Sequence, residues 1–76
     1  MQLAGYHTLE ELAEILNLPE GFLLEMLEAD AVQTLFLCGE HNWFSRDIQR
    51  FIERNAKKIA EQQALMLRLQ RETTQN

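Results

Sequence analysis

Positive charge is missing from the first half of this sequence, because neither Lys nor Arg occurs before Arg46. Residues 1–43 carry a formal charge of −8 and the rest of the chain carries +3, which gives the total of −5. The acids therefore come first and the bases second. An asymmetry of this kind bears on partners rather than on the fold, since it sets which charged surfaces each half attracts.

Cysteine, proline and glycine are also scarce, with one Cys, one Pro and three Gly among 76 residues. The single Cys38 excludes an intrachain disulfide, which favours a reducing setting. The scarcity of Pro and Gly excludes a low-complexity linker, and so short a chain has room for one core. No apolar stretch approaches membrane-spanning length, and the first residues lack the pattern of a signal peptide. We therefore expect one cytoplasmic domain without a membrane partner.

The residue patterns of enzymes are absent as well. The sequence has no nucleophile with a nearby base and no glycine-rich phosphate loop, and it is too short for a substrate pocket. Cys38 and His41 have a spacing found in metal sites, but two ligands do not make a structural zinc site. We expect a small buried cysteine and a surface histidine at these positions. No catalytic residue, cofactor or metal ligand is predicted.

Among the patterns that are present, two predict short helices joined by a tight turn. Thr8 is a good N-cap, and Glu11 completes a capping box before a run of apolar residues at helical spacing. Asn17 is suited to end this helix in a left-handed conformation. Pro19 suits the first turn of a second helix, which continues to about Ala29. The two helices would form a helix-turn-helix unit.

A β-hairpin and a long helix are predicted next. Residues 34–38 and 42–44 are β-prone, and Gly39 and Glu40 supply a turn between them. Ser45 is then expected to cap one long helix, whose apolar stripe continues past what so small a core can cover. The predicted fold is mainly α: a small winged helix-turn-helix, with a short hairpin as its wing and a long C-terminal helix.

The order of these elements resembles the small winged-helix domains of the MerR regulators and of the phage and plasmid excisionases. The segment TLEELAEILNLP, residues 8–19, is similar to that family's first helix and turn. The segment GEHNWFSRDIQRFIE, residues 39–53, is similar to its wing tip and third helix. The resemblance implies a DNA-binding fold in residues 1–56, followed in residues 57–76 by a C-terminal helix with a frayed end that mediates dimerisation or partner binding.

The second helix departs from this family, whose second helix and wing are basic because phosphate contacts supply much of the binding energy. Here the helix is acidic with apolar shoulders, and docking it onto DNA is disfavoured. One interpretation is a solvated face that keeps a small domain soluble. The other is a surface for a protein partner with a basic patch, using aromatic anchors. The predicted protein-binding residues are Glu20, Phe22, Leu24, Glu25, Glu28 and Trp43.

A second resemblance supports the interpretation as a protein-binding surface. The segment NWFSRDIQRFIERNAKK is similar to the Trp-containing wing and long polar helix of the chaperone-modulator family. Members of that family look like MerR domains but bind a J-domain co-chaperone. The similarity implies that a MerR-like domain can serve protein binding, and it does not identify a partner for this chain.

A stripe of basic residues indicates an alternative function. These residues recur at helical spacing along the third helix, where they would contact DNA phosphates or form a solvated face stabilised by ion pairs. They are Arg46, Arg50, Arg54, Lys57 and Lys58. The last part of the same helix carries a weak heptad pattern that predicts a homodimer or packing with a partner helix. Its predicted dimerisation residues are Ile59, Met66 and Leu69.

Two functions are therefore expected as alternatives. The first is a non-enzymatic regulatory module that binds a protein partner through the acidic second helix and the wing. The second is a dimeric DNA-binding transcriptional regulator, or an excisionase-like protein, that contacts phosphates through the basic stripe. The two differ in salt dependence, because phosphate binding releases counterions and weakens steeply as salt rises.

Overall fold

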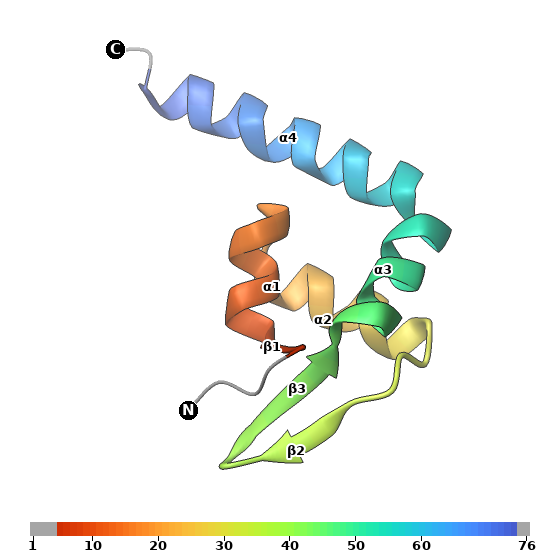
Figure 1. Cartoon of the computed structure of the whole chain (residues 1–76). Helices are drawn as coiled ribbons and strands as arrows, with labels where there is room; N and C mark the ends of the chain where they lie inside the picture. Colours follow the sequence, from red (N-terminus) through yellow and green to blue (C-terminus); the bar gives the residue numbers. More distant parts are fainter. Residues whose placement is uncertain (1–4, 75–76) are drawn as a thin grey trace.

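Residues 5–74 are described by the computed structural model, and within them the chain forms four helices and a three-stranded antiparallel sheet (Figure 1). In chain order the elements are β1 (Tyr6–Thr8), α1 (Leu9–Leu16), α2 (Glu20–Ala29), β2 (Leu35–Leu37), β3 (Glu40–Phe44), α3 (Ser45–Arg54) and α4 (Ala56–Thr74). The prediction of a mainly helical fold with a β-hairpin is confirmed. Over the described residues, none of the helices has both the length and the apolar character needed to cross a bilayer.

The first two helices form where local sequence signals place them. In the predicted capping box, the Thr8 amide donates to Glu11 Oε1 (2.9 Å), and the Glu11 amide donates to Thr8 Oγ1 (3.2 Å). α1 ends at Asn17, whose φ of 53° is left-handed. Leu18 then turns back into the core, and α2 begins directly after Pro19. The end of α1 and the end of α2 agree with the prediction, whereas Pro19 precedes the first turn of α2 and is not part of it.

The sheet has the order β1-β3-β2, so β3 lies in its middle. β1 is an element that the sequence pattern does not predict, because three residues are too few to show a periodicity. Its pairing with β3 defines it, with His7 opposite Trp43. β2 pairs along the other side of β3, with Phe36 opposite His41.

The turn between β2 and β3 consists of Cys38 and Gly39, one residue earlier than predicted. Both residues have a positive φ, 53° and 78°, as in the two-residue turns whose twist matches that of the flanking strands. Cys38 is therefore exposed at the hairpin tip, and the expectation of a buried cysteine is wrong. His41 is on the surface, as expected.

The predicted long helix is two helices, interrupted at Asn55. The side-chain Nδ2 of Asn55 donates to the carbonyl of Phe51 (2.9 Å), which also accepts from the Asn55 backbone amide (3.0 Å). Ser45 does not cap α3, since it is the first helical residue and makes no capping hydrogen bond. Its Oγ instead donates to the carbonyl of Gly5 (2.9 Å) and lies 2.8 Å from His7 Nε2. Ser45 therefore joins the start of α3 to β1.

The core draws apolar side chains from all four helices, the turn between α1 and α2, and the middle strand. Its buried members are Leu12, Ala13, Leu18, Leu23, Leu27, Trp43, Ile48, Phe51 and Ile59. Trp43 is 3% exposed and Ile59 is 4% exposed. Their predicted placement, as a surface anchor and a dimerisation residue, is therefore wrong. Both side chains lie among the buried core residues that α1, α2 and α3 also contribute to.

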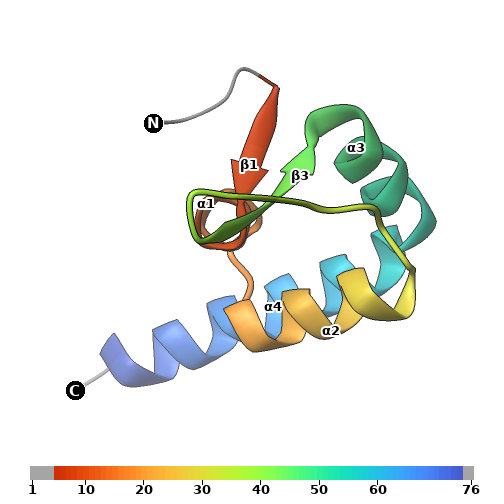
Figure 2. The same cartoon turned by 90° about the horizontal axis from the view of Figure 1, so that it is seen from below.

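α4 continues beyond the core and past the end of α1 (Figures 1 and 2). One hydrogen bond, from Gln63 Nε2 to the carbonyl of Leu16 (2.7 Å), fastens the middle of α4 to α1. The remainder of α4 projects and gives the molecule an elongated shape of 43 × 27 × 18 Å.

Candidate functional site

The predicted protein-binding residues of α2 fall into two groups. Glu20, Glu25 and Glu28 are exposed, as expected for an acidic face. Phe22 and Leu24 are half-buried and pack against the core, so each offers only part of its side chain to a partner. Trp43, the sixth residue predicted for this surface, contributes from below rather than as a projecting anchor, because its side chain is almost fully covered.

A shallow groove follows α2 on the side that faces the β-hairpin. It consists of two adjoining hollows of about 160 and 240 Å³, which share Leu24, His41 and Trp43 as lining residues. Leu27 and Val32 also line the first hollow, and Leu9 also lines the second. Each hollow has polar or charged lining residues as well. The groove therefore has a largely apolar floor, made by side chains from α1, α2 and β3.

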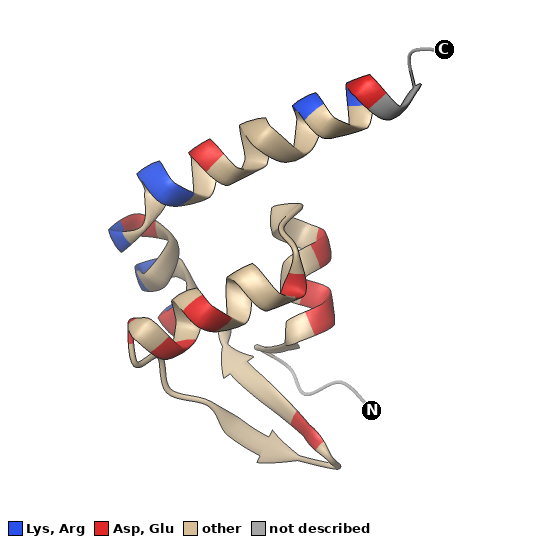
Figure 3. Cartoon of the chain, turned by 180° about the vertical axis from the view of Figure 1, so that it is seen from behind, with Lys and Arg blue, Asp and Glu red and all other residues tan. Residues whose placement is uncertain are grey.

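The rim of this groove is acidic. Its charged lining residues are Glu10 from α1, Glu20 and Glu28 from α2, and Glu40 from β3. No Lys or Arg is among the residues that line either hollow. Figure 3 shows acids without bases over α1, α2 and the hairpin tip, whereas α3 and α4 carry the bases together with further acids. Glu25 is exposed but lines neither hollow, so it lies outside the groove.

A row of three rings leads from the groove to the edge of the hairpin. The rings of Trp43 and His41 have centroids 6.2 Å apart, and those of His41 and Phe36 are 4.8 Å apart in an edge-to-face arrangement. Exposure rises along this row, from 3% at Trp43 to 60% at Phe36. Phe36 is therefore the large aromatic residue that the hairpin offers to a partner.

The sequence prediction found only part of this site. The sequence predicts Glu20, Leu24 and Glu28 of α2 and Trp43 of β3, but it does not assign Glu10, Glu40 and His41 to binding. They join the groove because α1 and β3 bring them to α2, and no local pattern encodes that contact. A usable signal was the alternation of side chains along a strand, since it places His41 and Trp43 on one face of β3.

The predicted basic stripe is divided by the structure. Arg54 forms an ion pair with Asp30, with Nη2 and Nε at 2.6 and 2.9 Å from Asp30 Oδ2. This hydrogen bond lowers the pKa of Asp30 and raises the pKa of Arg54. Arg46 lies over the ring of Phe44, 5.9 Å from its centroid. The break at Asn55 then separates these arginines from Lys57 and Lys58, which are exposed at the start of α4, while Arg50 is exposed on α3.

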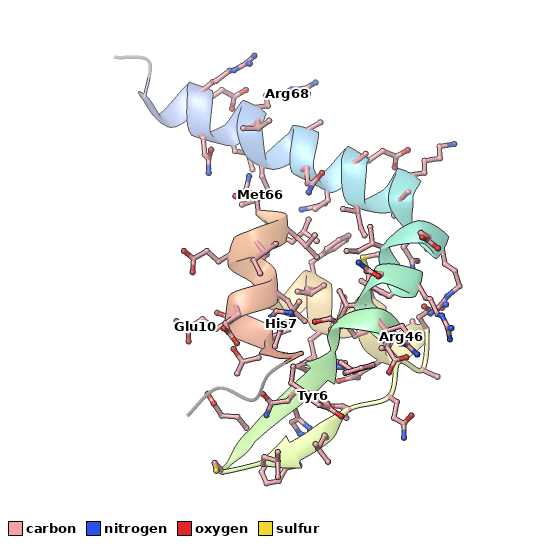
Figure 4. All side chains as sticks on the ribbon, in the orientation of Figure 1. Tyr6, His7, Glu10, Arg46, Met66 and Arg68 are labelled. Carbon is pink, nitrogen blue, oxygen red and sulfur yellow. The ribbon has the colours of Figure 1, made fainter. Side chains whose placement is uncertain are left out.

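The predicted dimerisation residues are not equivalent. Ile59 lies in the core, and Met66 is half-buried, pointing from α4 towards the end of α1 (Figure 4). Leu69 is 48% exposed, and the nearby Leu65 and Leu67 are exposed to similar degrees. Of the three predicted dimerisation residues, Leu69 alone has an exposed side chain.

The side chains in the described part of the chain do not gather around a metal position: no three His, Cys, Asp or Glu residues are placed to hold one ion. Comparison of the whole chain with protein families, with characterised proteins and with solved structures finds no match. Function is therefore inferred from the chemistry of the groove and of the basic residues on α3 and α4.

Proposed function

We propose that this chain is a non-enzymatic protein-interaction module, whose groove binds a basic segment of a partner protein. The observation that carries the proposal is the composition of the groove. Apolar side chains around Leu24 and Trp43 form its floor, and four glutamates and no base form its charged rim. A segment with Lys or Arg on either side of one or two large apolar residues matches both features.

The magnitudes indicate what each part of the groove contributes. Burying one Leu- or Phe-sized side chain of the partner is worth roughly 1.5–3 kcal/mol. An exposed ion pair contributes only about 0.2–1 kcal/mol and is weakened by salt. The apolar floor therefore supplies the anchor, while the glutamates select a basic sequence and fix its orientation. We expect the affinity to fall moderately with salt and not to vanish.

We propose that α1, α2, the β2–β3 hairpin and α3 form a winged helix-turn-helix of the MerR and excisionase type. The order of the elements, the tight turn from Asn17 to Pro19 and the hairpin before α3 support it. In that arrangement the acidic groove lies beside the second helix, where a DNA-binding member of this family would present Lys and Arg side chains.

DNA binding by a dimer is the second candidate, and the separation of charge supports it. Arg46, Arg50, Lys57 and Lys58 are exposed on α3 and the first turn of α4, away from the acidic groove. Exposed bases on adjacent helices are suited to phosphate contacts. We rank this function second because Arg54 is engaged by Asp30, which leaves the stripe without one of its central charges.

Peptide selection tests the first candidate. Phage-displayed random peptides are selected on the wild-type chain and on a variant with Glu10, Glu20, Glu28 and Glu40 changed to Gln. The control variant changes four exposed glutamates outside the groove: Glu14, Glu25, Glu53 and Glu61. We expect wild type and control to enrich peptides with Lys or Arg beside large apolar residues, and the groove variant to lose the basic preference. Equal enrichment on all three proteins would contradict the proposal.

A further inference from the structure

β2 is an edge strand whose outer side has no neighbouring strand among residues 5–74 (Figure 1). In a hairpin closed by a two-residue turn, the residues that flank the turn exchange both backbone hydrogen bonds, and the pattern alternates from there. Leu37 and Leu35 therefore bond to β3. Phe36 lies between them and points its N–H and C=O groups away from β3, towards the open side of β2. An edge of this kind is a template for another strand.

Nothing in the composition of this edge discourages such pairing. Edge strands are commonly protected by charged residues or by proline. Residues 31–39 contain neither. The three side chains of β2 are also exposed, at 41% for Leu35, 60% for Phe36 and 36% for Leu37. The edge thus offers both unpaired backbone groups and apolar side chains.

We propose that β2 pairs in antiparallel fashion with β2 of a second copy of this chain, about a two-fold axis at Phe36. In this register Phe36 lies opposite Phe36 of the second copy, and Leu35 lies opposite Leu37. The outward-pointing backbone groups meet one another, because positions of the same parity face the open edge in both copies. The two small sheets become one six-stranded sheet.

Charge and shape explain why a second copy fits this edge. A two-fold contact places each surface against itself, so a charged edge would meet like charges, whereas this edge brings only neutral residues together. Aromatic and aliphatic cross-strand pairs stabilise a sheet. Because Phe36 ends the row of rings that begins at Trp43, the rows of the two copies would meet at the axis. The inference does not depend on what the groove binds.

The oligomeric state of the full chain tests the proposal. Two short strands form a small interface, so we expect weak association, with the mass rising from 8.9 kDa towards twice that value between about 10 µM and 1 mM. Phe36→Lys should remain monomeric in sedimentation equilibrium over this range. Leu69→Lys, an equal change of charge at an exposed leucine of α4, should associate as wild type does. The proposal is overturned if wild type stays monomeric, or if Leu69→Lys alone abolishes association.

Hydrogen exchange identifies the strand that pairs. The Phe36 amide faces the open edge, so its exchange should slow as the concentration rises and the dimer forms. The amides of Leu35 and Leu37 already bond to β3 and should change little. If the dimer formed through α4 instead, the exchange rate of the Phe36 amide would be the same at every concentration. That result would overturn the proposal.

Discussion

The ion pair between Asp30 and Arg54 gives single residues a pH-dependent role in this fold. It joins the C-terminal end of α2 to the last residue of α3. The hydrogen bond from Arg54 lowers the pKa of Asp30 in the folded state below its value in the unfolded chain. The pair therefore contributes its full stabilisation above the unfolded-state pKa, near pH 4. That contribution is lost as the pH falls through the lower, folded-state pKa.

Replacing Arg54 should reveal this coupling. In Arg54→Gln we expect the pKa of Asp30, measured by NMR titration of its carboxyl carbon, to rise towards its ordinary value. The stability difference from wild type should be larger at pH 7 than in acid below the folded-state pKa of Asp30, where this carboxyl is protonated in both proteins. The control is Arg50→Gln, an exposed arginine one turn earlier, which should leave the pKa of Asp30 unchanged. An unaltered pKa in Arg54→Gln would show that the pair does not form.

Residue-scale prediction from the sequence succeeds for charge and fails for burial. The exposed glutamates of α2 are identified because helical spacing separates Glu20 and Glu28 from the apolar stripe. Trp43 is misplaced because the segment HNWF has no clear alternation of polar and apolar residues. Its buried face is decided by packing against α1 and α2, which no short segment encodes.

The hairpin carries a prediction at the scale of an element. Cys38 occupies a left-handed position of its turn, which Asn adopts more readily than other non-glycine residues. We expect Cys38→Asn to stabilise the fold by about 0.5 kcal/mol, and Cys38→Val to destabilise it, because a β-branched residue fits this conformation poorly. Urea unfolding under reducing conditions measures both. Equal stability of the two variants would contradict the assigned turn.

α4 carries a second prediction of this kind, because its two ends differ in role. Ile59 lies in the core, so Ile59→Ala should lower the free energy of unfolding by about 2–4 kcal/mol. Leu69→Ala, at a 48% exposed position, should cost at most about 0.5–1 kcal/mol. Urea unfolding at two protein concentrations checks this. A cost for Ile59→Ala that grows with concentration would indicate a role in a dimer interface instead.

Elements with strong local signals are predicted from the sequence, and those formed by tertiary contact are not. The capping box at Thr8 and the left-handed Asn17 fix the ends of α1 without help from other elements. β1 exists only because β3 pairs with it. The break at Asn55 carries no Pro or Gly, so the continuous apolar pattern on either side predicts one helix.

At the scale of the whole molecule, the two-ended charge of the sequence becomes two separate surfaces. Four glutamates from α1, α2 and the hairpin tip line the groove, while α3 and the first turn of α4 carry exposed bases (Figure 3). The groove therefore attracts cations locally, although the chain as a whole also has a basic side. The sequence predicts the separation, but the groove appears only when three elements meet.

The most direct test of the central claim is an NMR titration of the full chain with two probes. One is a short amphipathic peptide of lysine and leucine, and the other is random duplex DNA at low salt. We expect the peptide to shift the amide resonances of Leu24, His41 and Trp43, and the DNA to leave the groove unchanged. The opposite result would be groove resonances that the peptide leaves unchanged, together with DNA-induced shifts at Arg46, Arg50 and Lys57. It would contradict the proposed protein-binding function and support the DNA-binding alternative.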